Sequence, residues 1–318
     1  NSIYKFAIEL SLMKRFSCTL NFVLLFMVSL NVWSANSAPR KRLLMDYNWK
    51  FIQSDVKEAE KLKFDDSKWR TLNLPHDWSI EGEFKEDAAT KGPGGFLPTG
   101  IGWYRKHFSL STIQKEQKFW IEFDGVYMNS DVWINGQHLG KHLYGYTSFY
   151  YDLSRYLTKG DNILAVRVNN SIQPNSRWYS GSGIYRHVWL NITGPVHIAQ
   201  WGTYITTPAV DSASATVAIR TSVENSLSIA KNVVLRSVVK NESGKEIATI
   251  ETPFSLPPSA KTDIEQTIKV ISPLLWSIET PKLYTISSSI VEGTKVSDNL
   301  ISTFGIRKIE FDKDKGFL

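Results

Sequence analysis

The sequence predicts an all-β protein made of two successive β-sandwiches. Short segments of alternating apolar and polar residues recur along the chain between turn residues, whereas apolar residues at helical spacing are nearly absent. Aromatic residues make up 13% of the chain and include 11 tryptophans, which suits either β-sandwich cores or sugar-binding surfaces. At 318 residues the chain is long enough for two domains with sizeable cores.

The first predicted sandwich covers residues 40–202 and is typical of a jelly roll. Alternating segments at 119–123, 131–134 and 162–168 predict strands. Asn135-Gly136 follows the second of them and predicts a two-residue hairpin turn, because both residues tolerate a positive φ. The only helical pattern, at residues 55–62, is long enough for a turn or two at most. Short strands with frequent turns indicate a sandwich or jelly roll.

The second predicted sandwich covers residues 203–306. After Trp201-Gly202 the chain becomes rich in Ser, Thr, Val and Ile and poor in Trp. About seven strands in about 100 residues are typical of an immunoglobulin-like sandwich. The clearest strand patterns are at 215–223, 231–239, 261–270 and 283–291, with polar turns such as 242–244 between them.

The first 38 residues predict export from the cell. A basic pair, Lys14-Arg15, precedes an apolar run at 22–28 and small residues at 34–38, which is the layout of a secretory signal peptide. Asn21, Ser29 and Asn31 interrupt the longer apolar stretch at 20–32, which is therefore too short to span a membrane. We expect a signal peptide at about residues 13–38 with Met13 as the start, a periplasmic or secreted protein, and no membrane span after cleavage.

Composition excludes several functional classes. The net charge of +6 comes from charges of mixed sign that form no basic stripe, so nucleic acid is not an expected partner. The six His residues are scattered, and the only cysteine, Cys18, lies within the predicted signal peptide, so we expect neither a metal site nor a disulfide. The glycine-rich stretch 91–102 lacks the Gly-Lys-Ser/Thr ending of a phosphate-binding loop. It is interpreted as a flexible loop near a binding site, with a purely structural turn as the alternative.

An aromatic loop precedes a predicted strand at 184–190. Arg177, Trp178 and Tyr179 lead into the glycine-rich turn 180–183, and the alternation that follows predicts a strand covered on both faces. Aromatic rings pack against the apolar faces of sugars, so such a loop at a strand end suits sugar recognition. The alternative is a structural loop whose aromatic rings belong to the core.

This loop and five further segments resemble glycoside hydrolase family 2, the β-galactosidase-type enzymes. The segments occur in the family's order and extend over nearly everything after residue 40. They are Gly102-Trp-Tyr-Arg-Lys106, residues 123–136, residues 146–153, Leu275-Trp-Ser-Ile-Glu-Thr-Pro-Lys-Leu-Tyr284 and Phe304-Gly-Ile-Arg-Lys308.

The resemblance implies the non-catalytic N-terminal part of a retaining exo-β-glycosidase, most similar to β-galactosidases. In the family, two catalytic glutamates lie on a (β/α)₈ barrel of roughly 250 residues that follows these domains, and here residues 307–318 resemble only its entry. The expected partners are a β-linked oligosaccharide or glycoside and the catalytic barrel itself. The resemblance implies no cofactor within this chain and allows a Mg²⁺ or Na⁺ ion in the full enzyme. The alternatives are a β-glucuronidase- or β-mannosidase-type parent enzyme, a stand-alone carbohydrate-binding module, and a structural or adhesive sandwich.

The resemblance also nominates site residues. Arg177, Trp178, Tyr179 and Ser180 are candidates for the wall of the sugar pocket, and Phe96 and Trp103 are candidates for contact with the barrel. Well-known family members carry an acidic residue six positions before the Gly-Ile pair, where this chain has Arg177. An arginine there donates to sugar hydroxyls or a carboxylate, pairs with an acid of the barrel, or has no ligand role.

The neighbouring residues His76 and Asp77 are weighed as an acid–base pair. No serine or cysteine nucleophile accompanies them. Structural hydrogen bonding is therefore the expected role of this pair.

Overall fold

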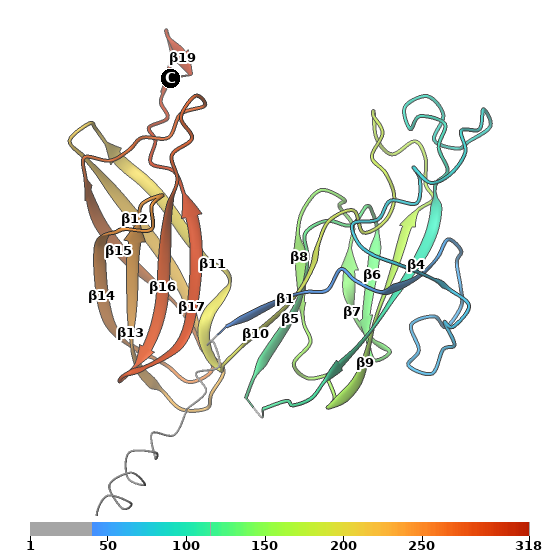
Figure 1. Cartoon of the computed structure of the whole chain (residues 1–318), viewed down its shortest axis with the longest axis horizontal. Coiled ribbons are helices and arrows are strands. Elements are labelled where there is room, and N and C mark those ends of the chain that lie inside the picture. Colours follow the sequence, from blue (N-terminus) through green and yellow to red (C-terminus); the bar gives the residue numbers. More distant parts are fainter. Residues whose placement is uncertain (1–39, 115, 318) are drawn as a thin grey trace, which may run out of the picture. The chain divides into compact units, whose positions relative to one another are not determined.

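The computed structural model describes residues 40–114 and 116–317 (Figure 1). The predicted signal peptide and start site lie outside these residues. Every regular element in the described part is a β-strand, which confirms the all-β prediction. No apolar helix long enough to cross a membrane occurs in this part of the chain.

The first sandwich consists of two antiparallel sheets. One sheet has the strand order β1 (Lys41–Leu44), β10 (Val188–Thr193), β5 (Lys118–Phe123) and β8 (Phe149–Asp152). The other has the order β3 (Arg70–Leu72), β2 (Trp49–Ile52), β4 (Gly100–Leu110), β9 (Gly160–Asn170), β6 (Ser130–Ile134) and β7 (Gln137–His142). Neighbours in each sheet are often distant in sequence, as in the Greek-key connections of jelly rolls.

Alternation along the strands builds the main core between these sheets. Phe51 and Tyr104 from the six-stranded sheet and Ile121 and Leu190 from the four-stranded sheet belong to one buried cluster. The intervening residues of β5, β10 and their neighbours point to the opposite faces, as the period of two requires.

A second cluster covers the outer face of the six-stranded sheet. Trp103 of β4 packs there with Trp69 and Ala59, which lie in or next to the loop between β2 and β3. The buried guanidinium of Arg105 anchors this loop, because its Nε donates to Asp66 Oδ2 at 2.7 Å. The pattern at 55–62 forms turns within this loop and no helix.

The turn between β6 and β7 has the predicted geometry. Asn135 and Gly136 have φ values of 50° and 83°, and Ile134 pairs with Gln137 across the two-residue turn. The Asn135 side chain donates to the carbonyl of Tyr156 at 2.9 Å, which ties the hairpin to the loop before β9.

The predicted strand at 184–190 begins later than expected, at Val188. The backbone before it bonds to other loops instead of a neighbouring strand: the N–H of His76 donates to the carbonyl of Ile184 at 2.8 Å. The carboxylate of Asp46 accepts from the N–H of Val188 at 3.0 Å, at the residue where pairing with β5 starts. The sequence alternation thus continues into a segment whose hydrogen bonds are not those of a sheet.

The second sandwich has the seven strands of an immunoglobulin-like fold. Its first sheet has the order β11 (Val196–Val210), β12 (Ser214–Asn225) and β15 (Ala260–Ile271). Its second sheet has the order β14 (Glu246–Leu256), β13 (Lys231–Lys240), β16 (Tyr284–Glu292) and β17 (Lys295–Phe304). A small hairpin, β18 (Phe311–Asp312) with β19 (Gly316–Phe317), follows.

Pairing places the start of the second sandwich before the predicted boundary at 203. Val196 already pairs with Asn225 of β12, and Val196 and Ile198 lie in the core of the second sandwich. The change in composition at Trp201 coincides with an irregularity inside β11, where the register shifts between Ile198 and Thr203. The boundary prediction therefore identified a bulge within a strand and not the domain limit.

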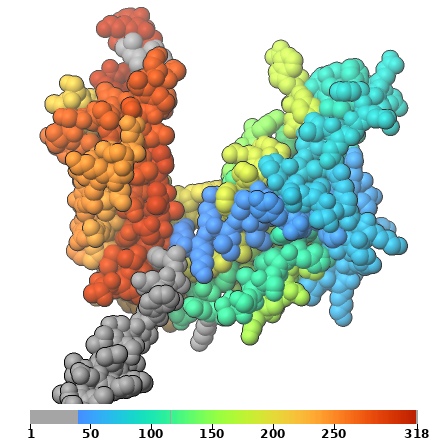
Figure 2. Space-filling view, viewed as in Figure 1, coloured from blue at the N-terminus to red at the C-terminus, as the bar shows by residue number. Residues whose placement is uncertain are grey.

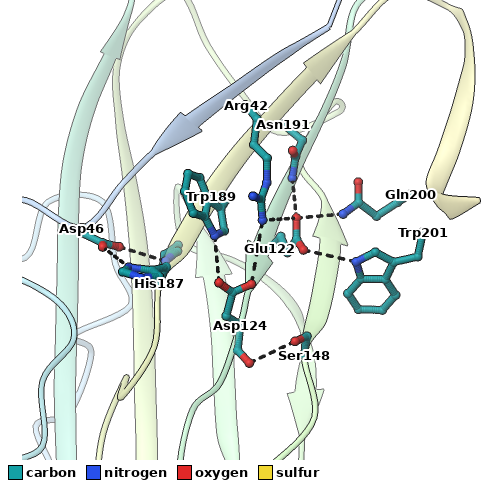
Figure 3. A network of polar contacts seen from close by, with 11 residues as sticks. Arg42, Asp46, Glu122, Asp124, Ser148, His187, Trp189, Asn191, Gln200 and Trp201 are labelled. Atoms are coloured by element: carbon teal, nitrogen blue, oxygen red, sulfur yellow. Dashed lines mark hydrogen bonds and ion pairs between the residues drawn. The ribbon is translucent and has the colours of Figure 1, made fainter. Parts of the chain in front are cut away.

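Buried polar groups connect the four-stranded sheet of the first sandwich to β11 (Figure 3). Glu122 of β5 accepts hydrogen bonds from Asn191 at 2.9 Å, Gln200 at 2.9 Å and the indole of Trp201 at 3.2 Å. Arg42 of β1 lies 3.5 Å from the same carboxylate. One carboxylate thus joins three strands of the first sandwich to the first strand of the second.

Candidate functional site

Two of the segments singled out in the sequence meet at one end of the first sandwich. Asn170, the last residue of β9, pairs with Gly100, the first residue of β4. The segment that leaves β9 and the glycine-rich segment that enters β4 therefore start from neighbouring positions. In Figure 2 both segments, cyan for residues near 85 and yellow-green for residues near 175, project from this end of the sandwich.

These two segments enclose a small cavity. Its volume of about 20 Å³ has room for about one water molecule. A sugar does not fit inside, so any sugar contact at this end must use the outer surface of the loops. The cavity is lined by Ser79, Thr90, Gly94, Leu97, Pro98, Asn170, Gln173, Asn175, Ser176, Trp178, Tyr179, Ser180 and Gly181.

Asn170, at the end of β9, and Asn175 hold the 175–180 loop in place through hydrogen bonds. The buried amide of Asn170 donates to the carbonyl of Gly181 at 2.9 Å and to the hydroxyl of Ser182 at 2.7 Å. The amide of Asn175 donates to Asn170 Oδ1 at 2.6 Å, and the hydroxyl of Tyr127 donates to Asn175 Oδ1 at 3.1 Å. Both ends of the loop are therefore fixed by side chains of the sheet end.

Asp77 is the second support of the loop. Its carboxylate accepts the N–H of Ser182 at 2.8 Å, the N–H of Ser79 at 2.9 Å and the hydroxyl of Tyr179. Burial, together with this hydrogen bond to the carboxylate, raises the pKa of Tyr179. Asp77 thus positions the aromatic loop.

His76, the neighbour of Asp77, is enclosed in a structural network. Its Nδ1 lies 2.7 Å from the hydroxyl of Tyr104, and its Nε2 lies 2.8 Å from Arg70 Nη2. Burial lowers the pKa of His76, and hydrogen bonding to Glu81 opposes this shift only in part. These contacts agree with the structural role expected for the pair.

The loop presents its aromatic residues to solvent. Trp178 is 70% exposed and Tyr179 is 42% exposed, whereas Ser180 is half-buried. The guanidinium of Arg177 is also exposed and lies 5.2 Å from the centre of the Trp178 ring. The alternative in which Trp178 belongs to the core is therefore wrong, and the loop offers a free ring beside a cation.

The two candidates for barrel contact lie in different environments. Phe96 is 40% exposed on the glycine-rich segment, next to Leu97, which lines the cavity beside the aromatic loop. Trp103 is only 3% exposed and stacks on Trp133 in the cluster on the outer face of the six-stranded sheet. Because Trp103 has almost no free surface, it is a core residue, and its assignment to an interdomain contact is corrected.

Sequence reasoning missed a group of tyrosines beside the loop. Tyr127 and Tyr146 have ring centres 5.3 Å apart, and Tyr144 is 5.7 Å from Tyr146. The hydroxyl of Tyr146 lies against the side chains of Ser176 and Ser180. These tyrosines come from two different connections, and only the fold brings them to the same end of the sandwich.

The described residues contain no cluster of three or more His, Cys, Asp or Glu that could hold a metal ion. The loop at this end of the sandwich presents the exposed aromatic rings of Trp178 and Tyr179 and the exposed guanidinium of Arg177.

Comparison with known proteins decides the family. Residues 44–194 match the sugar binding domain of glycosyl hydrolases family 2, and residues 196–307 match a second domain of the same family. The chain belongs to glycosyl hydrolase family 2. The two matched ranges meet at the start of β11, where pairing of the second sandwich begins.

Relatives within family 2 include enzymes of two named activities. The chain is 44% identical over 281 residues to the beta-galactosidase BoGH2A of Bacteroides ovatus, covering 88% of this chain and 33% of that protein. It is 39% identical over 294 residues to a putative beta-glucuronidase of Formosa agariphila, covering 92% of this chain and 28% of that protein.

A solved family 2 structure from Bacteroides cellulosilyticus superposes with a TM-score of 0.84 at 40% identity. The superposed region covers 87% of this chain and 37% of the chain in that solved structure. The chain thus spans about a third of the length of the curated relatives that it matches, and it corresponds to their non-catalytic N-terminal part.

Proposed function

We propose that this chain forms one wall of the substrate pocket of a retaining exo-β-glycosidase of the β-galactosidase type. The catalytic carboxyls, about 5–5.5 Å apart in a retaining enzyme, belong to a barrel domain that follows in family 2. The chain's own task is then to position a terminal β-linked sugar and to support that domain. On its own the chain hydrolyses no glycoside.

The observation that carries this proposal is the exposed Arg177–Trp178–Tyr179 tip on a braced loop. On a loop fixed by Asp77 and Asn170, the exposed Trp178 ring offers an apolar face beside hydrogen-bonding side chains, which suits the apolar face and the hydroxyl groups of a sugar. Loop residues on a rigid sheet commonly serve binding. The match of this domain to a sugar binding domain supports a sugar as the ligand.

The favoured sugar is a β-galactoside, since the beta-galactosidase of B. ovatus shares 44% identity with the chain. The second candidate is a β-glucuronide, which the beta-glucuronidase relatives and Arg177 together support. A guanidinium forms strong, charge-assisted hydrogen bonds with a carboxylate. Arg177 is therefore the residue whose removal separates the two substrates.

The test uses the full-length enzyme, in which the catalytic domain follows this chain. We expect Arg177→Ala to lower kcat/KM for 4-nitrophenyl β-galactoside by about tenfold to a hundredfold, the loss of one charge-assisted hydrogen bond. Because Arg177 is exposed, its removal should leave the melting temperature within about 2 °C. For a glucuronidase, the same change lowers kcat/KM for the β-glucuronide far more than for the galactoside.

Arg155→Ala is the matched control, since Arg155 is also exposed but lies in the connection between β8 and β9 at the other end of the sandwich. The control should keep its activity. Unchanged kcat/KM in Arg177→Ala, or a parallel fall in melting temperature, contradicts a binding role. Turnover by residues 40–317 alone contradicts the assignment of catalysis to the following domain.

We also propose that the enzyme is exported, with cleavage near Ala38. The predicted signal peptide at about 13–38 supports this proposal. Mass spectrometry of the mature protein's N-terminus tests it, and retention of Met13 in the mature protein contradicts it.

A further inference from the structure

The connection between β7 and β8 carries an exposed apolar surface that the proposed function has not used. Leu143, Tyr144 and Tyr146 follow β7, and they are 61%, 59% and 52% exposed. Contiguous exposed apolar side chains of this size are uncommon on a soluble protein without an interaction role.

This segment is held in place although its side chains are free. Its ends are joined by His142 Nε2 and Thr147 Oγ1, which lie 3.1 Å apart. In its middle, the carbonyl of Gly145 accepts the hydroxyl of Tyr185 at 2.8 Å. A Cβ on Gly145 would overlap the ring of Tyr127, so only glycine allows the backbone to lie this close to that ring.

The exposed rings are therefore pre-positioned. A surface that is already fixed loses little conformational entropy when a ligand binds, which favours affinity. The segment also lies beside the candidate loop, because the ring of Tyr146 is 5.3 Å from that of Tyr127, whose hydroxyl donates to Asn175 Oδ1 at 3.1 Å.

The chemistry of this surface suits a neutral sugar. The faces of Tyr144 and Tyr146 offer apolar contact, and their hydroxyl groups offer hydrogen bonds at the rim. Residues 143–146 carry no charge, in contrast to the adjacent Arg177. A charged ligand group is matched by arginine, whereas the tyrosines match an uncharged pyranose ring.

We propose that Tyr144 and Tyr146 form a platform that binds a sugar unit beyond the terminal one, so that the preferred substrate is a neutral β-linked oligosaccharide. The inference rests on the proposed function, because it extends the same pocket wall from Trp178 along the substrate. Tyr144 and Tyr146 act as specificity residues and take no part in bond cleavage.

The experiment compares two substrates in the full-length enzyme: β-1,4-galactotetraose and 4-nitrophenyl β-galactoside. The measured quantity is the ratio of their kcat/KM values. Loss of one ring face should lower this ratio about tenfold in Tyr144→Ala and in Tyr146→Ala. Tyr156→Ala is the control, because Tyr156 is an exposed tyrosine before β9, at the other end of the sandwich, and should leave the ratio unchanged.

An unchanged ratio in both tyrosine variants overturns the platform while leaving the glycosidase proposal intact. A fall in activity on both substrates together with a lower melting temperature also overturns it, since this result means that another domain covers the tyrosines. If the enzyme hydrolyses neither substrate, the proposed galactosidase activity fails instead. Titration of residues 40–317 with the tetrasaccharide then tests the platform by itself: weaker binding by Tyr144→Ala supports it, and equal binding overturns it.

Discussion

At the residue scale, the candidate site depends on polar side chains that the sequence does not mark as functional. Asp77 and Asn170 touch no expected ligand, yet they fix the backbone that presents Trp178. Sequence reasoning identified the loop from its aromatic and glycine content. It assigned Asp77 a structural hydrogen-bonding role, but it could identify neither the partners of Asp77 nor the role of Asn170, because these groups become neighbours only in the folded sandwich.

The exposure of Trp178 was also not predictable from the sequence. Composition alone allowed both a core tryptophan and a binding tryptophan, and the pattern of neighbouring residues did not distinguish them. Trp103 shows the opposite case, since it is buried by a loop that packs on the outer face of the sheet. Whether an aromatic residue is free depends on what covers it, which local sequence does not state.

The buried imidazole of His76 leads to a prediction about pH. Burial lowers its pKa in the folded state below the usual histidine value of 6.5, although Glu81 and Asp77 oppose the shift and Arg70 reinforces it. The unfolded chain therefore binds a proton first as the pH falls. The contribution of His76 to stability is complete above about pH 6.5 and is lost as the pH decreases below that value.

Titration of the His76 imidazole by NMR checks the shift directly, and urea unfolding at pH 7.5 and 5.5 checks its effect on stability. We expect a folded-state pKa below 6.5 and a lower free energy of unfolding at pH 5.5. His142, whose pKa is also lowered by burial, contributes in the same direction, so His76→Gln should reduce the pH dependence without abolishing it. A His76 pKa above 6.5 contradicts the prediction.

At the scale of elements, turns with special backbone geometry were predicted most accurately. Asn135-Gly136 specifies its hairpin through residues that accept positive φ, a property that belongs to the two residues themselves. The strand expected at 184–190 was placed too early because alternation reports which face is buried and not which hydrogen bonds are made. Ile184 is fully buried but bonds to the loop at His76.

Gly136→Ala tests the hairpin. A Cβ at this position would make only ordinary van der Waals contacts, at 3.8 Å to the carbonyl oxygen of Glu60 and 3.9 Å to the backbone nitrogen of Leu62, so the cost comes from the φ of 83°. We expect a loss of about 1 kcal/mol in the free energy of unfolding, measured by urea denaturation. Gly136→Asn should lose less, because Asn accepts this backbone conformation more readily.

Gly92→Ala is the control for this substitution, since its Cβ would touch only the Phe96 ring at 4.0 Å and its φ is not in the left-handed region. Equal losses for Gly136→Ala and Gly136→Asn would mean that the side chain at this position, and not the φ angle, determines the cost.

At the scale of the whole molecule, the two-sandwich architecture was predictable and its internal boundary was not. Strand density and turn chemistry indicated two sandwiches, because each domain contains its own alternating core. The boundary was drawn at a change in composition, but β11 crosses that change without leaving its sheet. Glu122 and the buried pair of Arg40 with Asp298 join the sandwiches through residues that are distant in sequence.

The corrected boundary predicts which fragment of the second sandwich folds. A polypeptide of residues 196–307 keeps Val196 and Ile198, which are fully buried in the core, whereas residues 203–308 lack both. Each loss removes about 1.5–3 kcal/mol of burial, a large part of the 5–15 kcal/mol that stabilises a typical domain. The shorter fragment also leaves Asp298 without the N–H of Ile198, its partner at 2.7 Å.

We therefore expect residues 196–307 to give a β-type far-ultraviolet circular dichroism spectrum and a cooperative thermal transition. Residues 203–308 should melt at a clearly lower temperature or without cooperativity, because the sheet lacks its first paired residues opposite Val223 and Asn225. Ile198→Ala in the longer fragment provides an intermediate case, since it removes the buried side chain but keeps the backbone pairing. Equal melting temperatures for the two fragments would show that the part of β11 before Thr203 does not stabilise the second sandwich. The domain boundary would then lie at the register shift between Ile198 and Thr203.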